Sequence, residues 1–166
     1  MKNLVRVISA ILFAIPVAAQ TSGRQTQMES TVCTFEDGKE ISIQYDGQVD
    51  ESAKLSMGQL WPHSTRPMLL FTQTPLRIES SPIPAGAFSV YVIPGKKQWT
   101  LIVNRNVTSG VEYRQQEDLV RASMETGQVS SGEKQPKLAF GRLAPKRCEL
   151  RFYYGNTGAS VEFHEQ

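Results

Sequence analysis

Few residues of this chain combine into a pattern that could carry out a reaction. Ser131 and Lys134 match the S-x-x-K pattern of penicillin-binding enzymes, whose serine nucleophile and lysine lie one turn apart on a helix. The companion motifs S-D-N and K-T-G do not occur in the sequence, and the surrounding residues favour turns over a helix. The sequence also lacks G-x-S-x-G and H-E-x-x-H. We therefore predict no catalytic residue.

A general base at neutral pH would have to be one of two histidines. His164 follows Phe163 in a predicted strand, and the alternation of that strand places its ring on the solvent side. His63 lies in a predicted loop beside Trp61 and Arg66. An aromatic ring with hydrogen-bonding neighbours could stack on a sugar or hold an apolar ligand, although Trp61 could equally pack in the core. We predict a ligand-binding role for Trp61, His63 and Arg66.

Arg121 is the fourth candidate for ligand binding. It follows Asp118 by three residues in a predicted short strand, so it could bind an anion or form a salt bridge with that carboxylate. The salt bridge is the simpler interpretation. A metal site is not predicted, because two cysteines and two scattered histidines provide neither C-x-x-C nor H-x-x-x-H spacing. No cofactor is predicted either.

Cys33 and Cys148 lie far apart in the chain and are its only cysteines. By strand alternation, Cys33 shares a face with Phe35. Cys148 shares a face with Leu150 and Phe152, so both thiols point toward the predicted core. In an oxidising compartment such a pair is expected to form a disulfide. The alternative is two buried free thiols that behave as small apolar side chains.

The first residues carry the signature of a secretory signal peptide. The basic residues Lys2 and Arg6 precede an apolar run over 7–17, and small residues up to Ala19 come before a polar stretch. This run of about 11 residues is shorter than the roughly 20 that a membrane-spanning helix needs. We predict cleavage after Ala19, export to the periplasm or the extracellular space, and no transmembrane segment in the mature chain. Polar residues 20–30 are expected to form a disordered leader.

The charge balance excludes one class of partner. The chain has 18 basic and 16 acidic residues, and Lys2 and Arg6 are the only charged residues of the predicted signal peptide, so the mature chain carries 16 of each sign. No cluster of Lys and Arg follows. Nucleic acid is therefore not an expected partner. The expected partner is an unknown small ligand or an envelope protein.

The remaining sequence indicates short strands separated by turns. No run of a dozen residues keeps the 3.6-residue period of a helix. About nine strands with regularly spaced turns predict an all-β fold, a single antiparallel β-sandwich that is jelly-roll-like or a partly open barrel. It would form one domain over 31–166. The strands are expected at Val32–Phe35, Glu40–Tyr45, Met68–Thr72, Leu76–Glu79, two within Ile83–Asn104, Leu119–Met124, Lys137–Leu143, Arg147–Tyr153 and Ala159–His164.

Residues 83–104 are predicted to form the centre of this fold. Two strands flank a Pro-Gly turn at 94–95, and each is largely apolar on both faces. A strand that is apolar on both faces is typical of the middle of a sandwich or barrel. Trp99, at the start of the second strand, is expected to pack in the core, as are Val90 and Leu101.

Three segments between the strands are expected to be irregular. Gly127–Pro136 is rich in turn-forming and charged residues, and we expect an exposed excursion there. Gly155–Gly158 has a glycine at each end of Asn-Thr, and we expect a hairpin turn. Asp46–Ser64, with its Asp, Gly and Ser clusters, is expected to be a loop.

The central strands resemble a known family. Pro84–Pro94 followed by Trp99–Asn104 is similar to the core signature of bacterial exported proteins grouped as domain of unknown function 2911. Cys33–Lys39 resembles the opening of a cysteine-bearing branch of that family. Glu117–Arg121 resembles its Asp-x-x-Arg segment, and Ala159–Phe163 its closing strand. The family has no assigned biochemical activity, so the resemblance implies a fold and an export route but no reaction.

One segment departs from the family pattern. Family members usually follow a Val-Trp pair with Arg, then Gly-Ala-Asn, then Thr, whereas Leu60–Pro67 keeps only the tryptophan. Any site that other members form with this segment is changed here. We therefore predict an exported, non-catalytic β-sandwich protein that binds a ligand or an envelope partner. The alternatives are a hydrolase-type enzyme using loop residues near His63 and a purely structural envelope component.

Overall fold

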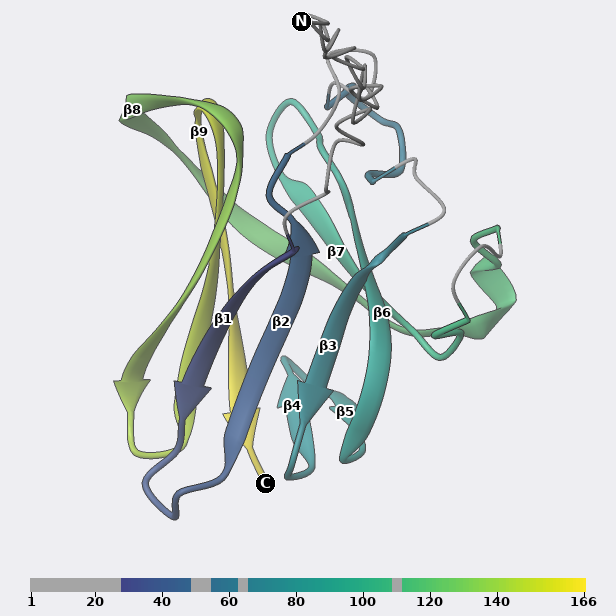
Figure 1. Cartoon of the computed structure of the whole chain (residues 1–166), viewed down its shortest axis with the longest axis vertical. Coiled ribbons are helices and arrows are strands. Elements are labelled where there is room, and N and C mark those ends of the chain that lie inside the picture. The colour runs from purple at the N-terminus through teal and green to yellow at the C-terminus, as the bar shows by residue number, and fades with distance from the viewer. Residues whose placement is uncertain (1–27, 49–54, 63–65, 109–111) are drawn as a thin grey trace, which may run out of the picture.

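The computed structural model describes residues 28–48, 55–62, 66–108 and 112–166 (Figure 1). Within these ranges the chain is almost entirely antiparallel β-structure, as the strand pattern predicted. The elements are β1 (Met28–Thr34), β2 (Glu40–Asp46), β3 (Met68–Thr72), β4 (Leu76–Ile78), β5 (Ser81–Ile83), β6 (Gly86–Ile93), β7 (Trp99–Asn104), the 3-10 helix η2 (Gln115–Glu117), β8 (Asp118–Ala144) and β9 (Arg147–Glu165).

The strands hydrogen-bond in the order β1-β2-β3-β6-β7-β8-β9-β4-β5, so the sheet is open, with β1 and β5 at its edges. The predicted all-β antiparallel fold is therefore confirmed, and the sheet does not close into a barrel. The sheet folds into two layers at β8. We call β1, β2, β3, β6, β7 and residues 118–124 of β8 sheet A, and the rest of β8 with β9, β4 and β5 sheet B.

The two longest strands each turn back on themselves, as their ribbons show in Figure 1. The two ends of β9 lie side by side: the amide of Glu165 donates to the carbonyl of Lys146 at 2.9 Å, and a guanidinium nitrogen of Arg147 lies 3.4 Å from Glu162 Oε2. The expected hairpin turn at Gly155–Gly158 is also part of strand β9, and its residues pair with β8. The expected excursion Gly127–Pro136 is wrong in one respect, because these residues belong to β8.

The strand over 127–136 was not predicted because its pairing is irregular. Gln128 pairs with Thr157 and Glu133 pairs with Gly155, and the register shifts on both sides of Glu133. Such bulges add residues to one strand and break the alternation that sequence patterns depend on.

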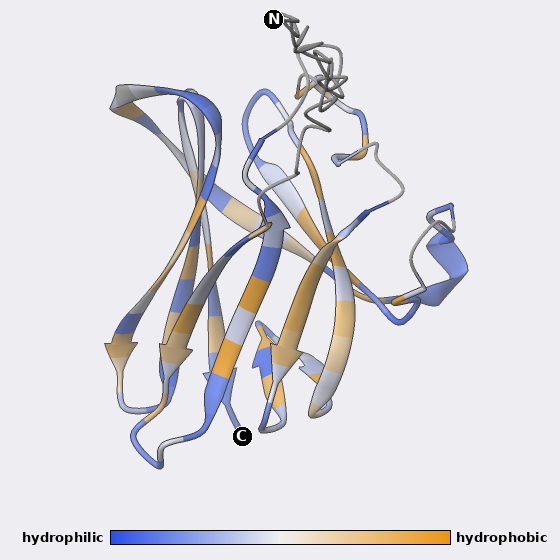
Figure 2. Cartoon of the chain, in the orientation of Figure 1, coloured by the Kyte–Doolittle hydropathy of each residue, from blue (hydrophilic) through white to orange (hydrophobic). Residues whose placement is uncertain are grey.

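The pair β6–β7 forms the centre of sheet A, as predicted. Val90 pairs with Val103 and Val92 pairs with Leu101, and all four side chains are at most 1% exposed. Figure 2 shows that hydrophobic residues run along β6 and β7, whereas β2 alternates between the two classes. The register of the pair fixes which residues enter the core, because a one-residue slip would turn every side chain to the other face.

The core between the two sheets is built around aromatic rings. Phe152 of β9 contacts Trp61 and Trp99, with ring centroids 5.3 and 5.4 Å apart. Trp61 also joins β6 through its backbone, because its amide and carbonyl each form a 2.8 Å hydrogen bond with Val92. Within the expected loop Asp46–Ser64, Trp61 therefore forms an isolated β-bridge to sheet A.

The predicted disulfide is present in the structure. Cys33 of β1 and Cys148 of β9 are bonded, their Cα atoms are 6.2 Å apart, and both are buried. The bond joins an edge strand of sheet A to sheet B and closes a sequence separation of 115 residues.

The N-terminal boundary of the fold differs slightly from the expectation. Strand β1 begins at Met28, so residues 28–30 of the expected leader are paired with β2. The predicted signal peptide and its cleavage after Ala19 lie outside the described residues. Within the described part of the chain, no helix has the length and apolar character needed to cross a membrane.

Candidate functional site

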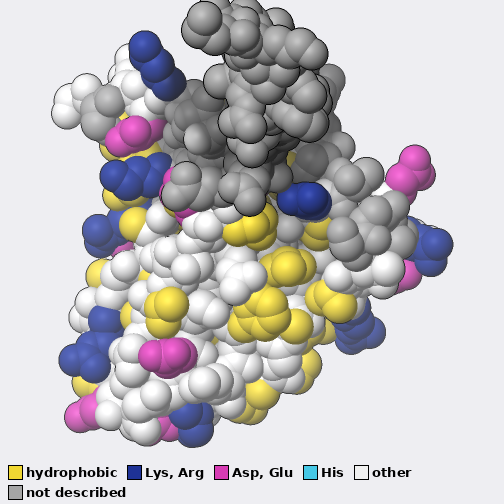
Figure 3. Space-filling view, viewed as in Figure 1, with side chains coloured by type: hydrophobic (Ala, Val, Ile, Leu, Met, Phe, Trp, Pro, Cys, Tyr) yellow, Lys and Arg dark blue, Asp and Glu magenta, His cyan; other side chains and the backbone are white. Residues whose placement is uncertain are grey.

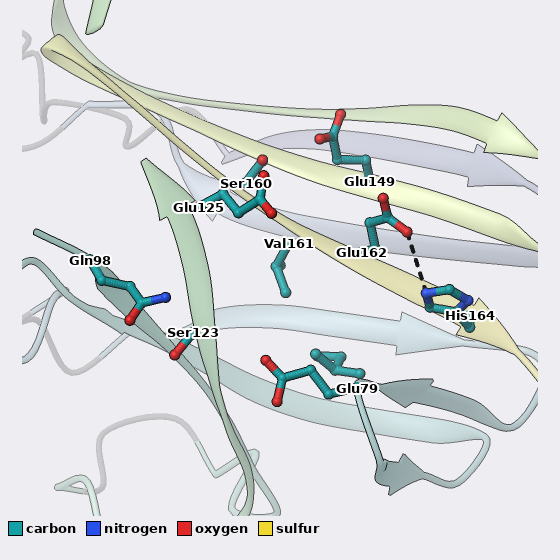
Figure 4. A pocket seen from close by; sticks show the side chains of 10 residues that line it. Glu79, Gln98, Ser123, Glu125, Glu149, Ser160, Val161, Glu162 and His164 are labelled. Carbon is teal, nitrogen blue, oxygen red and sulfur yellow. Dashed lines mark ion pairs between the residues drawn. The ribbon is translucent and has the colours of Figure 1, made fainter. Parts of the chain in front are cut away.

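Strand β9 of sheet B pairs with β8 over one part of its length and with β4 over another, and a groove lies between the two pairings. Residues 157–160 of β9 pair with β8, whereas residues 164–165 pair with β4. Residues 161–163 lie between these two ladders, where β8 and β4 diverge. The groove at this fork has a volume of about 320 Å³, and its wall includes Glu79, Glu125, Glu149, Glu162, Ser160 and His164 (Figure 4). We call it the acidic groove.

Strand alternation explains why polar side chains line this groove. Along the end of β9, Ala159, Val161 and Phe163 are buried, so Ser160, Glu162 and His164 lie on the outer face. Glu125 of β8 pairs directly with Ser160, and directly opposed residues of an antiparallel pair project to the same side. The groove therefore belongs to the outer face of sheet B and not to the core.

Glu79 enters the groove from the turn between β4 and β5. Ile78 and Ser81 are the last paired residues before this turn, which leaves Glu79 and Ser80 as a two-residue loop. Glu79 has φ +52°, the left-handed conformation that costs a non-glycine residue about 1 kcal/mol. Figure 4 shows its carboxylate directed toward the groove, with Val161 between it and Glu125 in this view.

Two of the four carboxylates in the groove are neutralised by arginine and two are not. Glu149 accepts a hydrogen bond from Arg151 Nε at 2.5 Å, and Glu162 lies 3.4 Å from Arg147. The carboxylates of Glu79 and Glu125 have no hydrogen bond or ion pair with any residue in the described part of the chain. The groove therefore carries excess negative charge on both arms of the fork.

His164 is held by its neighbours and is not arranged as a catalytic base. Its Nε2 lies 3.3 Å from Glu162 Oε2, and its Nδ1 lies 3.5 Å from a guanidinium nitrogen of Arg77. Partial burial lowers the pKa of His164, and the charge of Arg77 lowers it further. In the described residues no hydrogen bond links its ring to Ser123 or Ser160, the hydroxyl groups of the same groove. A nucleophile and base pair would require such a contact.

The same residues do not form a metal centre. Within the described ranges, no group of three or more His, Cys, Asp or Glu side chains is placed to hold a metal ion. The carboxylates of Glu149 and Glu162 already face arginine side chains. The arrangement is instead suited to a ligand with a positive charge and several hydrogen-bonding groups.

The predicted ligand-binding residues lie elsewhere. Trp61 is 2% exposed and packs its ring edge against Phe152, so its ring faces are not open to a ligand. Arg66 is exposed, and His63 lies outside the described residues. Trp61, Arg66 and Arg121 do not line the acidic groove. Ser131 and Lys134 of the S-x-x-K match are in β8 and not in a helix.

Arg121 forms the salt bridge that its spacing predicted. It lies 2.8 Å from Asp118 Oδ2 and also donates to the hydroxyl of Tyr113 at 3.0 Å. The same carboxylate accepts hydrogen bonds from Tyr113 at 2.7 Å and from Asn104 at 2.8 Å. This network closes the segment between β7 and β8 onto sheet A.

Sequence reasoning missed the groove residues for a physical reason. Alternation in 159–164 does predict outward Ser160, Glu162 and His164, and the chain end was expected to be solvated. The partners Glu79 and Glu125 come from other strands, and only the ladder order of β8, β9 and β4 brings them together. A single sequence does not contain that order.

The comparison with known proteins gives a family but no activity. The sequence model of a family described as protein of unknown function (DUF2911) matches residues 27–163, which include all of β1 to β8 and most of β9. No curated protein matches the chain, and no solved structure matches it. The resemblance of the central strands is thus confirmed, and the chain belongs to the DUF2911 family.

Proposed function

We propose that this chain is an exported, non-catalytic β-sandwich protein that binds a ligand carrying a protonated amine in the acidic groove. One observation carries the proposal. The two unneutralised carboxylates, Glu79 and Glu125, line one groove from the two arms of the fork. An ammonium group bound in this groove would pair with one of these carboxylates and leave its other hydrogen-bond donors for groups such as Ser160.

Export is supported by two independent features. The first 19 residues have the three parts of a signal peptide. The disulfide between Cys33 and Cys148 is of a kind that persists in oxidising compartments and is rare in the cytosol. Both features suit a periplasmic or extracellular protein.

A binding role is favoured over an enzymatic one by the contacts of the groove. His164 lies between Glu162 and Arg77, and no contact in the described residues joins its ring to a hydroxyl of the groove. The hydrolase alternative depended on His63, and no described residue supports it. The remaining alternative is a structural envelope component without a ligand.

Affinity for an amine is expected to be modest. Ion pairs at solvent-exposed positions contribute about 0–1 kcal/mol each and hydrogen bonds about 1 kcal/mol, so one or two pairs and a few hydrogen bonds predict a dissociation constant in roughly the millimolar range. Binding of this kind weakens as salt is added, because the Debye length falls to about 10 Å at 0.1 M.

The test is calorimetric titration of the mature protein with glucosamine and with N-acetylglucosamine at low and high salt. We expect glucosamine to bind, the neutral acetylated sugar to bind less tightly, and salt to weaken the first. Glu125→Gln and Glu79→Gln should each weaken glucosamine binding roughly twofold to fivefold, the effect of losing one exposed ion pair.

The matched control is Glu112→Gln, which removes an exposed carboxylate outside the groove. It should leave the dissociation constant unchanged. Two results would overturn the proposal: no detectable binding of any amine, or equal weakening by the control and the groove variants. The first would favour the structural envelope component.

A further inference from the structure

The acidic groove continues along the outer face of sheet B through two more hollows. The first, of about 290 Å³, is lined by Gly127, Gly158, Arg151 and Tyr153, and it shares Glu125 and Ser160 with the acidic groove. We call it the glycine groove. The second, of about 500 Å³, is lined by Val129, Glu133 and Lys137, and it shares Tyr153 with the glycine groove. We call it the distal groove.

The three grooves form one trough because neighbours share wall residues. From His164 in the acidic groove to Gly158 in the glycine groove, six residues of β9 span roughly 20 Å at the usual rise of a strand. The distal groove extends beyond that. A trough of this length is longer than a single sugar or a small amine, so it fits a chain-like ligand.

A pair of opposed glycines forms the floor of the middle section. Gly127 and Gly158 face each other across the β8–β9 ladder. A Cβ atom added at Gly127 would meet nothing within 4 Å, so the space above it is open. Glycine within a strand weakens the strand, and it marks places where something approaches the backbone closely. Here that space is the link between the two ends of the trough.

Tyr153 forms the wall beside this floor. A Cβ atom at Gly158 would lie 3.5 Å from two ring carbons of Tyr153, so the ring lies against the glycine. The side chain is half-buried and borders both the glycine groove and the distal groove. An aromatic ring at this position can stack against the apolar face of a sugar ring, while its hydroxyl interacts with Arg151 of the same groove.

The charges along the trough change from one end to the other. In the glycine groove Glu125 lines the same hollow as Arg151, whose guanidinium pairs with Glu149, and in the distal groove Glu133 accompanies Lys137, so both hollows contain residues of each sign. The acidic groove alone has excess negative charge. The trough therefore offers many hydrogen-bond donors and acceptors along its length and a preference for a cation at one end.

From these features we infer that the trough binds a linear oligosaccharide with amino-sugar units, one amine lying in the acidic groove and further sugar rings crossing Gly127 to reach Tyr153. This inference rests on the proposed function. A polyhydroxylated chain matches the alternating carboxylate, guanidinium and hydroxyl groups. A peptide added as an extra strand does not match, because the floor is the face of a sheet whose backbone groups are already paired.

The test is a chain-length series of glucosamine oligomers, from monomer to hexamer, titrated into the mature protein. The hexamer should bind about tenfold more tightly than the monomer, the size expected from one ring stacked on tyrosine and one or two additional hydrogen bonds. Gly127→Leu would fill the open space between the acidic and distal grooves. It should remove the gain in affinity with length, and Tyr153→Ala should remove most of it.

Gln44→Leu is the matched control, because it introduces leucine at an exposed strand position of sheet A, away from the trough. It should keep the full gain with length. Melting temperatures of all variants, compared with that of the wild type, show whether each one folds.

The outcomes separate this inference from the proposed function. If the monomer binds but the hexamer binds no more tightly, the oligosaccharide assignment is overturned and amine binding stands. If no oligomer and no monomer binds, both fail. If oligolysine peptides show the same gain with length and the same loss in Gly127→Leu and Tyr153→Ala, the occupant is a cationic peptide and the sugar assignment is overturned.

Discussion

The two outer faces of the sandwich are built from different kinds of side chain. On sheet A, Tyr91 and Ile102 pair with each other on the side away from the main core, and yet they are only 6% and 0% exposed. The ring of Tyr113 packs against Tyr91 with centroids 5.1 Å apart. On sheet B, the corresponding outward positions carry charged residues, serine, histidine and glycine.

The outer face of sheet A thus has a small second core. The segment between β7 and β8 brings Tyr113 over this face, and the network of Asp118 with Asn104 and Arg121 holds it there. Beyond this segment the face remains apolar: Val32 is 47% exposed and Phe71 is 38% exposed. Figure 3 shows hydrophobic side chains gathered over β3 and β6.

The outer face of sheet B is held by charge pairs in place of apolar packing. Arg147 with Glu162, and Arg151 with Glu149, are opposite charges on neighbouring positions. Exposed pairs of this kind contribute little to stability. The outer side chains of sheet A therefore contribute to folding stability, whereas those of sheet B contribute little and are available for ligand binding.

Breaking the bond between the two sheets should have the largest effect. The disulfide joins β1 of sheet A to β9 of sheet B, and closing a loop of 115 residues stabilises a chain by up to about 4.8 kcal/mol in the chain-entropy model. Reduction should therefore lower the melting temperature of the mature protein, by roughly 3–5 °C for each kcal/mol lost.

Differential scanning calorimetry with and without reductant measures this shift. The variant Cys33→Ser/Cys148→Ser should melt like the reduced wild type and should not respond to reductant. Two reactive thiols titrated in freshly exported, unfolded protein would contradict the bond.

The sequence predicted sheet A better than sheet B. The register-determining features of β6 and β7 are local, because a short loop over 94–98 joins two continuous apolar strands. In β8, the register shifts on both sides of Glu133 interrupt the alternation over 127–136. The short strand β5 was missed for another reason: Pro82 lies in its centre, and proline in a strand is confined to edges.

Among the candidate site residues, too, those set by local pattern could be predicted and those set by tertiary contacts could not. Cys33 with Cys148 and Asp118 with Arg121 could be predicted, the first pair from strand faces and the second from spacing along one strand. Trp61 was expected to be as suited to a ligand as to the core, and its burial depends on a bridge to Val92 that no local pattern indicates. Residues of the trough come from several strands, so only the tertiary structure assembles them.

A substitution on each outer face would sharpen the comparison between the sheets. Ile102→Ala on sheet A should cost about 2–4 kcal/mol, as in a true core, because the side chain is fully buried beneath neighbouring residues. Arg147→Ala on sheet B should cost under about 1 kcal/mol, because it removes only a half-exposed ion pair.

Urea unfolding of the two variants provides the measurement, with Val90→Ala as the reference for the main core. Equal losses for Ile102→Ala and Arg147→Ala would mean that sheet A has no second core. In that case the contrast between the two faces would not hold.

The smallest expected effect is a loss of stability at alkaline pH, which comes from two tyrosines packed against sheet A. Burial and a hydrogen bond to Asp118 together raise the pKa of Tyr113 to about 12. Burial and a hydrogen bond to Glu29 likewise raise the pKa of Tyr45 to about 12. In the unfolded chain a tyrosine loses its proton near pH 10, so between about pH 10 and 12 the folded state holds more protons than the unfolded state.

The stabilisation that these two phenols contribute is therefore complete below about pH 10 and is lost as the pH rises toward about 12. Tyrosinate absorbance followed from pH 9 upward should show a late phase in the folded protein that is missing in urea, where all tyrosines titrate near pH 10. Tyr113→Phe should reduce the amplitude of that late phase and leave the early phase unchanged. A single phase near pH 10 in the folded wild type would show that Tyr113 is not enclosed, and the cover over sheet A would then be open to solvent, like the trough on sheet B.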